Sequence, residues 1–148
     1  MVESVCFCLC FNAMCGSNPL NKIRGCDRQG CGHYGASRYG GRRHDGIDVE
    51  CEPGSFVYAP FSGTIVRQSR PYKTGGSHNN GLVIRGSGSW KGFKAKMWCF
   101  APTKTSGWMT ARQNLGSSVR LPYYGITQHL HLQLLKNGRS VDPTSYVC

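Results

Sequence analysis

The chain has 148 residues, a size that suits one compact domain, and 39% of them are hydrophobic, which is enough to build a core. Twenty glycines and seven prolines leave little room for long helices and favour short strands joined by turns. Eighteen lysines and arginines face seven acidic residues, giving a net charge of +11, and no run approaches the ~20 apolar residues of a transmembrane span.

The first residues, MVESVCFCLCFNA (1–13), contain a short apolar run of the kind found in signal peptides. Glu3 precedes this run, whereas no lysine or arginine does. We therefore interpret residues 1–13 as a signal peptide or a misassigned N-terminus, and residues 14–148 as a single β domain. On this interpretation the three cysteines of the first stretch have no role in the fold.

Residues 15–43 form a lead-in that is rich in glycine, arginine and cysteine. Nine cysteines are many for this length, and such usage is typical of a secreted protein that folds in an oxidising compartment. No CxxC pair occurs, which argues against a zinc finger. The segment CDRQGC, from Cys26 to Cys31, instead has the form of a small loop closed by a disulfide.

Strand patterns begin just after His44. Apolar residues at positions 47, 49 and 51 alternate with acidic residues at 48, 50 and 52, which is the period of a β-strand. The segments SFVYA (55–59) and TIVRQ (64–68) flank the sequence PFSG. We predict that these two segments form a hairpin around that turn.

Three further strands are predicted in the second half of the chain. NNG (79–81) is a turn signal that precedes LVIRG (82–86), and FKAKMWCF (93–100) follows it. QHLHLQLL (128–135) places its leucines on one face, and KNGR (136–139) contains an Asn-Gly turn. The predicted fold class is therefore all-β, a small antiparallel sheet or sandwich with long loops.

Two histidine motifs carry the candidate chemistry. His129 and His131 lie two apart on a predicted strand, so both imidazoles face the same way. On a flat strand His44 and Asp48 would lie about 13 Å apart, but the Asp-Gly dipeptide between them favours a bend that brings them together. Imidazole and carboxylate both suit zinc, and three protein ligands leave a fourth position for water. The alternative is structural: a loop end, a turn cap and two histidines packed on a sheet.

The segments HDGIDV, VYAPFSGTIV, NNGLVI and QHLHLQLLKNGRSVDPTSYV follow one another in an order and spacing that resembles the lysostaphin/LytM-type zinc endopeptidase domain. The resemblance covers residues 44–147. It implies an antiparallel β core of the lysostaphin type with one zinc ion per chain, held by His44, Asp48 and His131. In those peptidases the histidine at the position of His129 assists catalysis without binding the metal.

The lead-in NAMCGSNPLNKIRGCDRQGCGHYGASR, together with HDGIDVEC, is similar to leukocyte cell-derived chemotaxin-2 and the avian myeloid proteins. These are secreted proteins built on the peptidase fold. The resemblance implies the disulfides Cys15–Cys51 and Cys26–Cys31. It also implies an extracellular protein with long disulfide-braced loops.

This chain departs from that family in its third disulfide and in the surroundings of Cys99. The family's third disulfide aligns with Lys94 and residues 135–137, where this chain has no cysteine, so we expect that bridge to be absent. Cys99 is then interpreted in three ways: as a partner of Cys148, as an inert buried thiol or as an added zinc ligand. We favour the first two over zinc ligation.

Cys99 also bears on catalysis. The peptidases have a second catalytic histidine in a Y-x-H-L strand, and that strand aligns with MWCFAP, which puts Cys99 at the histidine position. The chemotaxin family also lacks this histidine and is regarded as non-proteolytic. The resemblance thus implies a zinc-binding chemotaxin-like protein of leukocyte signalling or innate defence without efficient peptidase activity. The alternative is an active zinc endopeptidase that cleaves glycine-containing or peptidoglycan cross-bridge peptides.

The positive charge indicates acidic partners, and nothing in the sequence resembles a nucleic-acid-binding motif. Two clusters are candidates for binding a sulfated glycan or an acidic face of a cell-surface receptor, unless they are simply solvated loops: Arg38, Arg42 and Arg43, and Arg67, Arg70 and Lys73. Two other histidines, His33 and His78, are predicted on surface loops. The three tryptophans are predicted in the core or in the wall of a groove: Trp90, Trp98 and Trp108.

Overall fold

A computed structural model describes residues 9–148, which contain β-strands, three short 3-10 helices and no α-helix. The all-β fold class is therefore confirmed. No helix in this part of the chain has the length and hydropathy of a membrane span. The strands are β1 Cys26–Asp27, β2 Gly30–Cys31, β3 Ile47–Glu50, β4 Phe56–Tyr58, β5 Gly63–Ser69, β6 Gly81–Gly86, β7 Phe93–Trp98, β8 Phe100–Pro102, β9 Gly107–Met109, β10 Asn114–Ser118, β11 His129–Lys136 and β12 Arg139–Val141, and the 3-10 helices are η1 Tyr39–Gly41, η2 Gly88–Trp90 and η3 Pro143–Tyr146.

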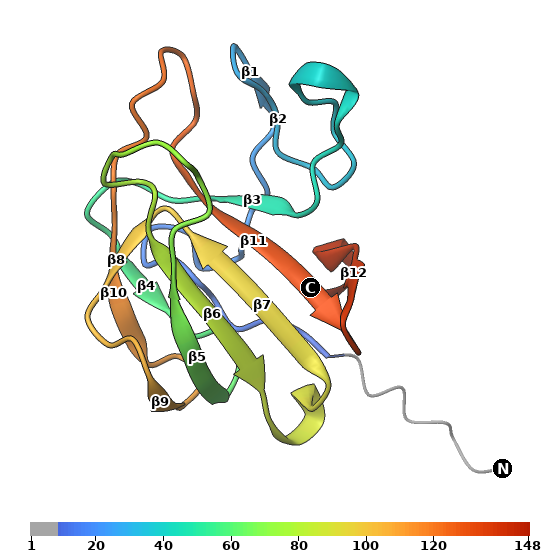
Figure 1. The fold of residues 1–148 in the computed structure, drawn as a ribbon, viewed down its shortest axis with the longest axis vertical. Helices are drawn as coiled ribbons and strands as arrows, with labels where there is room; N and C mark the ends of the chain where they lie inside the picture. Colours follow the sequence, from blue (N-terminus) through green and yellow to red (C-terminus); the bar gives the residue numbers. More distant parts are fainter. Residues whose placement is uncertain (1–8) are drawn as a thin grey trace, which may run out of the picture.

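The main element is a large antiparallel sheet with the strand order β12-β11-β7-β6-β5-β9, in which β3 pairs with the first half of β11 (Figure 1). On β11 the leucines at 130, 132 and 134 are buried in the core, as their alternation predicted. His129 and His131 alternate with these leucines and therefore point to the opposite face of the sheet. This alternation delivers both histidines to one side of the molecule.

The second sheet has the order β4-β10-β8, and it shows that the predicted hairpin around PFSG is wrong. β4 pairs with β10, whereas β5 pairs with β6 and β9. The physical reason is Phe61, which is 1% exposed and stacks on Trp90 at 4.9 Å between ring centroids. An apolar ring at this position is drawn into the core, so the chain crosses between the sheets instead of folding back in a solvent-exposed turn.

The predicted strand 93–100 is likewise divided between the two sheets. β7 ends at Trp98, Cys99 adopts the left-handed conformation with φ of 77°, and β8 resumes at Phe100 in the small sheet. A non-glycine residue in this conformation is strained, and here it provides the bend by which the chain changes sheets.

Residues 9–13 pack on the domain. Cys10 forms a disulfide with Cys148, and Phe11 is buried and stacks on Trp90 at 5.2 Å. The expectation that the cysteines of the first stretch have no role in the fold is thus wrong for Cys10. Cys6 and Cys8 lie outside the described residues, as does most of the apolar run, so processing at this end stays a prediction.

Three disulfides brace the described chain: Cys10–Cys148, and the two pairs that the family resemblance implies, Cys15–Cys51 and Cys26–Cys31. The expected pairing of Cys99 with Cys148 is wrong, since Cys148 bonds to Cys10. The physical reason is that residues 9–13 pack on the domain, which brings Cys10 within bonding distance of Cys148. Where the third family disulfide would lie, Lys94 is the cross-strand partner of Leu135.

Candidate metal centre

The candidate site lies where β3 meets the first half of β11. Asp48 and His131 are direct cross-strand partners, so their side chains lie next to each other on the same face. The chain reaches this position through Gly46, where a Cβ atom would lie 2.1 Å from the carbonyl oxygen of Leu132. Only glycine permits this close approach, which sets His44 beside the start of the strand. The bend predicted at this dipeptide is present.

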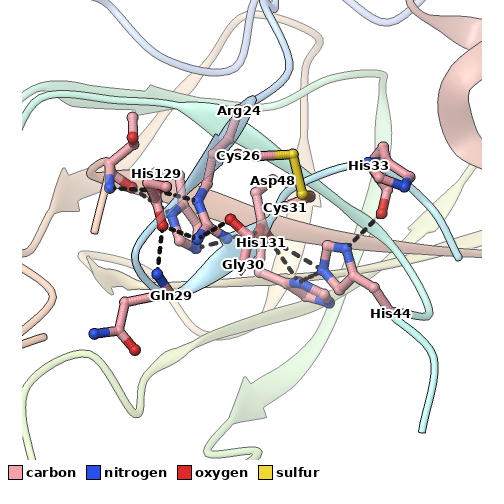
Figure 2. A network of polar contacts seen from close by, with 12 residues as sticks. Arg24, Cys26, Gln29, Gly30, Cys31, His33, His44, Asp48, His129 and His131 are labelled. Atoms are coloured by element: carbon pink, nitrogen blue, oxygen red, sulfur yellow. Dashed lines mark hydrogen bonds and ion pairs between the residues drawn. A yellow bond between two sulfur atoms is a disulfide. The ribbon is translucent and has the colours of Figure 1, made fainter. Parts of the chain in front are cut away.

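Three ligand atoms converge at one point (Figure 2). Nε2 of His44 lies 3.1 Å from Nδ1 of His131 and 3.2 Å from Oδ1 of Asp48, and the last two atoms are 3.1 Å apart. A tetrahedral zinc ion with bonds of about 2.0–2.1 Å would separate its ligand atoms by roughly 3.3–3.4 Å. The triangle therefore has nearly the dimensions that such an ion requires, and the two-nitrogen, one-oxygen donor set suits it.

The contacts behind each imidazole fix its orientation. Nδ1 of His44 lies 3.0 Å from the backbone carbonyl of His33, and the carbonyl can only accept, so this nitrogen donates. Nε2 is then the ring nitrogen that faces the triangle and the one that could bind an ion there. His131 stacks on Trp98 with 4.8 Å between centroids and 7° between planes. Both rings are thus held with a nitrogen toward a common centre.

Asp48 is charged although it is 2% exposed. Burial alone would raise the pKa of this carboxyl, but hydrogen bonds from His131 and His44 outweigh burial and hold the pKa well below its ordinary value. Its second oxygen, Oδ2, accepts a hydrogen bond of 2.9 Å from the guanidinium of Arg24, and Arg38 lies 3.6 Å from the same atom. One oxygen is therefore anchored while the other faces the imidazoles.

Arg24 joins the metal centre to the small disulfide loop. Its guanidinium is also paired with Asp27 through two hydrogen bonds, of 2.8 and 2.7 Å. It donates as well to the carbonyl of Gly30, which lies in the small loop (Figure 2). Asp27 accepts from the backbone of Gln29 and Thr127 as well. Neither Arg24 nor Asp27 could be predicted from the sequence, because nothing in their spacing relates them to Asp48.

His129 lies behind the triangle, on the side of Arg24. Its Nδ1 donates to the carbonyl of Thr127 at 2.7 Å, and its Nε2 lies 3.6 Å from Oδ2 of Asp48. Burial lowers the pKa of His129, against the opposing charge of Asp48, so the ring is neutral at neutral pH. A neutral histidine next to the ligand set, and outside it, has the protonation state of a general base.

The triangle opens into a groove of about 450 Å³. Its lining includes the three arginines Arg38, Arg42 and Arg43, and also Tyr72 and further aromatic residues. Burial raises the pKa of Tyr72 to about 12, and the nearby charge of Asp48 adds to the effect. Its hydroxyl is therefore a neutral hydrogen-bond donor at physiological pH.

Cys99 lines the same groove at the position that the alignment assigned to a catalytic histidine. It is 1% exposed and free, and burial, followed by the charge of Asp48, raises the pKa of its thiol to about 12. The convergent group of potential metal ligands found among residues 9–148 consists of His44, Asp48 and His131, without Cys99. A neutral, buried thiol therefore lines the groove at the position where the sequence resemblance predicts an imidazole in the peptidases.

Two expectations about which residues are buried need correction: the surface position predicted for His78 and the buried position predicted for Trp108. His78 is buried in the groove wall, where its Nε2 lies 3.1 Å from the hydroxyl of Tyr123, because the loop folds back over the sheet. Trp108 is 56% exposed, since it lies on the edge strand β9. By contrast, His33 is exposed, Trp90 is in the core and Trp98 is in the groove wall, as predicted.

Comparison with known proteins places this arrangement in a family. The model of peptidase family M23 matches residues 42–143. The chain belongs to peptidase family M23. The match includes all three residues of the triangle and His129, so they lie within the domain that defines the family.

Curated relatives extend the match into the lead-in. The chain is 40% identical to leukocyte cell-derived chemotaxin-2 of Mus musculus over 136 residues, covering 90% of this chain and 85% of that protein. It is 42% identical to myeloid protein 1 of Gallus gallus over 134 residues, covering 88% of this chain and 39% of that protein. The chemotaxin-2 family assignment is therefore confirmed, and it supports a chemotaxin-like role.

Solved structures confirm the lysostaphin-type fold. The catalytic domain of lysostaphin from Staphylococcus simulans superposes with a TM-score of 0.60 at 23% identity, covering 86% of this M23 chain and 94% of that one. A zinc-containing peptidase from Vibrio cholerae gives a TM-score of 0.58 at 22% identity, covering 94% and 40%. The fold of the β core is thus shared with these peptidases, while the chemistry depends on the residues of the groove.

Proposed function

We propose that this chain is a secreted, zinc-binding, chemotaxin-like protein of leukocyte signalling or innate defence that does not cleave peptides efficiently. The observation that carries the proposal is the set of three convergent ligand atoms on a chain 40% identical to a chemotaxin. Three disulfides and an extracellular family favour secretion.

Zinc is the proposed ion, one per chain, with His44, Asp48 and His131 as its ligands. The donor set is typical of zinc, the anchoring of His44 and Asp48 by outer contacts is typical of metal ligands, and a solved neighbour is described as zinc-containing. When bound, zinc supplies a positive charge that polarises a coordinated group and orders the loops that carry its ligands.

Weak or absent proteolysis is proposed because of Cys99. Peptide cleavage needs donors that stabilise a developing negative charge, and the loss of one such donor typically costs about 100- to 1000-fold in rate. The Cys99 thiol is neutral and buried, and thus a poor substitute for an imidazole. The protein would then use the ordered groove for binding, with a cell-surface receptor or a sulfated glycan as its partner.

Zinc stoichiometry in the purified protein tests the metal site. Elemental mass spectrometry should find one zinc per chain in the wild type and none in His44→Ala or Asp48→Ala. The exposed histidine of His33→Ala provides the matched control, because His33 contributes only its backbone carbonyl. Chelation at neutral pH should also lower the melting temperature of the wild type. Well-folded wild type without zinc would refute the site.

A second candidate function, a working endopeptidase, is favoured by one observation: His129 is neutral and adjacent to the ligand set, at the edge of an open groove. The test is incubation with a glycine-rich peptide and quantification of new amino termini. Cleavage by the wild type that disappears in both His131→Ala and His129→Ala would establish the enzyme. Intact peptide, with zinc bound, supports the binding protein.

A further inference from the structure

A row of cations crosses the solvent-facing side of the large sheet, beyond the metal groove. Arg85 on β6 and Lys94 on β7 are direct cross-strand partners, with Thr64 on β5 and Leu135 on β11 at the two ends of the row. Both cationic side chains are exposed. Their Cβ atoms are therefore about 5 Å apart, which places two like charges side by side.

These cations lack acidic partners. Arg85, Lys94 and the nearby Lys91 form no ion pair and no side-chain hydrogen bond with any part of the chain that the structure describes. They line a common cavity of about 570 Å³, whose lining also includes Phe93 and Leu135. The lining of this cavity contains no carboxylate.

The repulsion between these charges has an energetic consequence. Like charges directly opposite each other destabilise an antiparallel pair, and three cations around one cavity raise the local positive potential. An anionic group seated between Arg85, Lys91 and Lys94 would remove this repulsion and form charge-assisted hydrogen bonds. The cavity is thus complementary to a sulfate or carboxylate group.

The charge continues along β7 toward the metal groove. Lys96 is on the same face as Lys94, two residues on, and Trp98 follows at the groove wall. Lys94 and Trp98 are four residues apart, a distance of about 13 Å on a strand. A linear polyanion could therefore lie along β7 with one charged group in the cavity and others beside Lys96.

We propose that this cavity is an anion site for a sulfated glycan chain, formed by Arg85, Lys91 and Lys94 and extended by Lys96. The site has no exposed aromatic platform on which nucleobases could stack, because Phe93 is buried, and this favours a glycan over a single-stranded nucleic acid. The inference rests on the proposed extracellular role and is independent of zinc.

Binding to a heparin-derived oligosaccharide tests the site by calorimetry over a range of salt concentrations. The variant R85Q/K91Q/K94Q should raise the Kd about tenfold or more and flatten its dependence on salt, because three charge contacts are lost. The control K22Q/K104Q/R120Q removes the same net charge from three separate loops, outside every candidate cluster, and should change the Kd less than about threefold. Zinc content should stay at the wild-type value in both, and the melting temperature of R85Q/K91Q/K94Q should not fall, because its substitutions relieve the repulsion between Arg85 and Lys94.

Four results would overturn the proposal. Equal losses of affinity in the two triple variants would show that binding depends on net charge and not on this cavity. A larger loss in R42Q/R43Q would place the glycan in the metal groove. Undiminished binding of the desulfated oligosaccharide would remove the role of sulfate, and tighter binding of a DNA duplex would name a different partner. A well-folded wild type that is purified without zinc and still binds heparin through Arg85 and Lys94 would fail the metal test alone. That result would contradict the zinc proposal and leave the glycan site standing.

Discussion

At the scale of single residues, the two oxygens of Asp48 have different partners. Oδ1 faces His44 and His131, and Oδ2 is bonded to Arg24. A carboxylate with one free oxygen could rotate, whereas this one is held in one orientation by a buried guanidinium that is in turn held by Asp27. Preorganisation of this kind keeps the ligand atoms together before any ion arrives.

The link through Asp27 predicts a specific dependence of stability on pH. The side-chain hydrogen bonds from Arg24, against the smaller effect of burial, lower the pKa of Asp27, so its stabilising effect is complete above the unfolded value of about 3.9 and is lost as the pH falls toward the folded value. Asp27→Asn should reduce the free energy of unfolding by about 2–4 kcal/mol at pH 7, because the buried guanidinium of Arg24 keeps only one carboxylate partner, Asp48. Chemical denaturation at several pH values should find this difference shrinking below about pH 4. A difference that does not vary with pH would contradict the role of the charge.

Cys99 yields a second prediction at this scale. Because its thiol is buried, neutral and outside the ligand triangle, Cys99→Ala should retain one zinc per chain. Peptide mapping of the wild type should find Cys99 alkylated only after unfolding. Loss of zinc in the alanine variant, with Asp48 and both histidines intact, would make Cys99 a ligand.

At the scale of elements, the approach of β3 to β11 depends on Gly46. A methyl group at this position would overlap the carbonyl of Leu132, so Gly46→Ala should destabilise the fold by about 3 kcal/mol or more and lower zinc occupancy. Gly75→Ala is the matched control, because a Cβ there meets nothing within 4 Å, and its effect should stay within about 1 kcal/mol. Urea unfolding of both variants compares them, and equal losses would show that the close contact is unimportant.

The same elements show what the sequence can predict. The alternation in β11 indicated correctly which face holds His129 and His131, since a period of two is a local property. The partner of β4 could not be found this way, because the choice between β5 and β10 depends on where Phe61 is buried. β10 itself, NLGSS, has too little alternation to be recognised. Likewise, Arg24 reaches Asp48 only through tertiary packing.

At the scale of the whole molecule, the disulfides differ greatly in the length of chain that they close. Cys10–Cys148 spans 138 positions, whereas Cys26–Cys31 spans five. The entropy of loop closure predicts about 5 kcal/mol for the first and about 2 kcal/mol for the second. The double serine variants, unfolded in guanidinium, should follow this order. A greater loss from the Cys26–Cys31 pair would instead show that support of Arg24 outweighs chain entropy.

The bond between Cys10 and Cys148 also makes the backbone between them a ring. A single proteolytic cut anywhere inside that ring, for example in the exposed segment 72–77, leaves both pieces attached to each other. The two pieces of such a nicked chain separate only when the disulfide is reduced. For a protein proposed to act outside the cell in leukocyte signalling or innate defence, continuity of the molecule then does not depend on any one peptide bond of the ring.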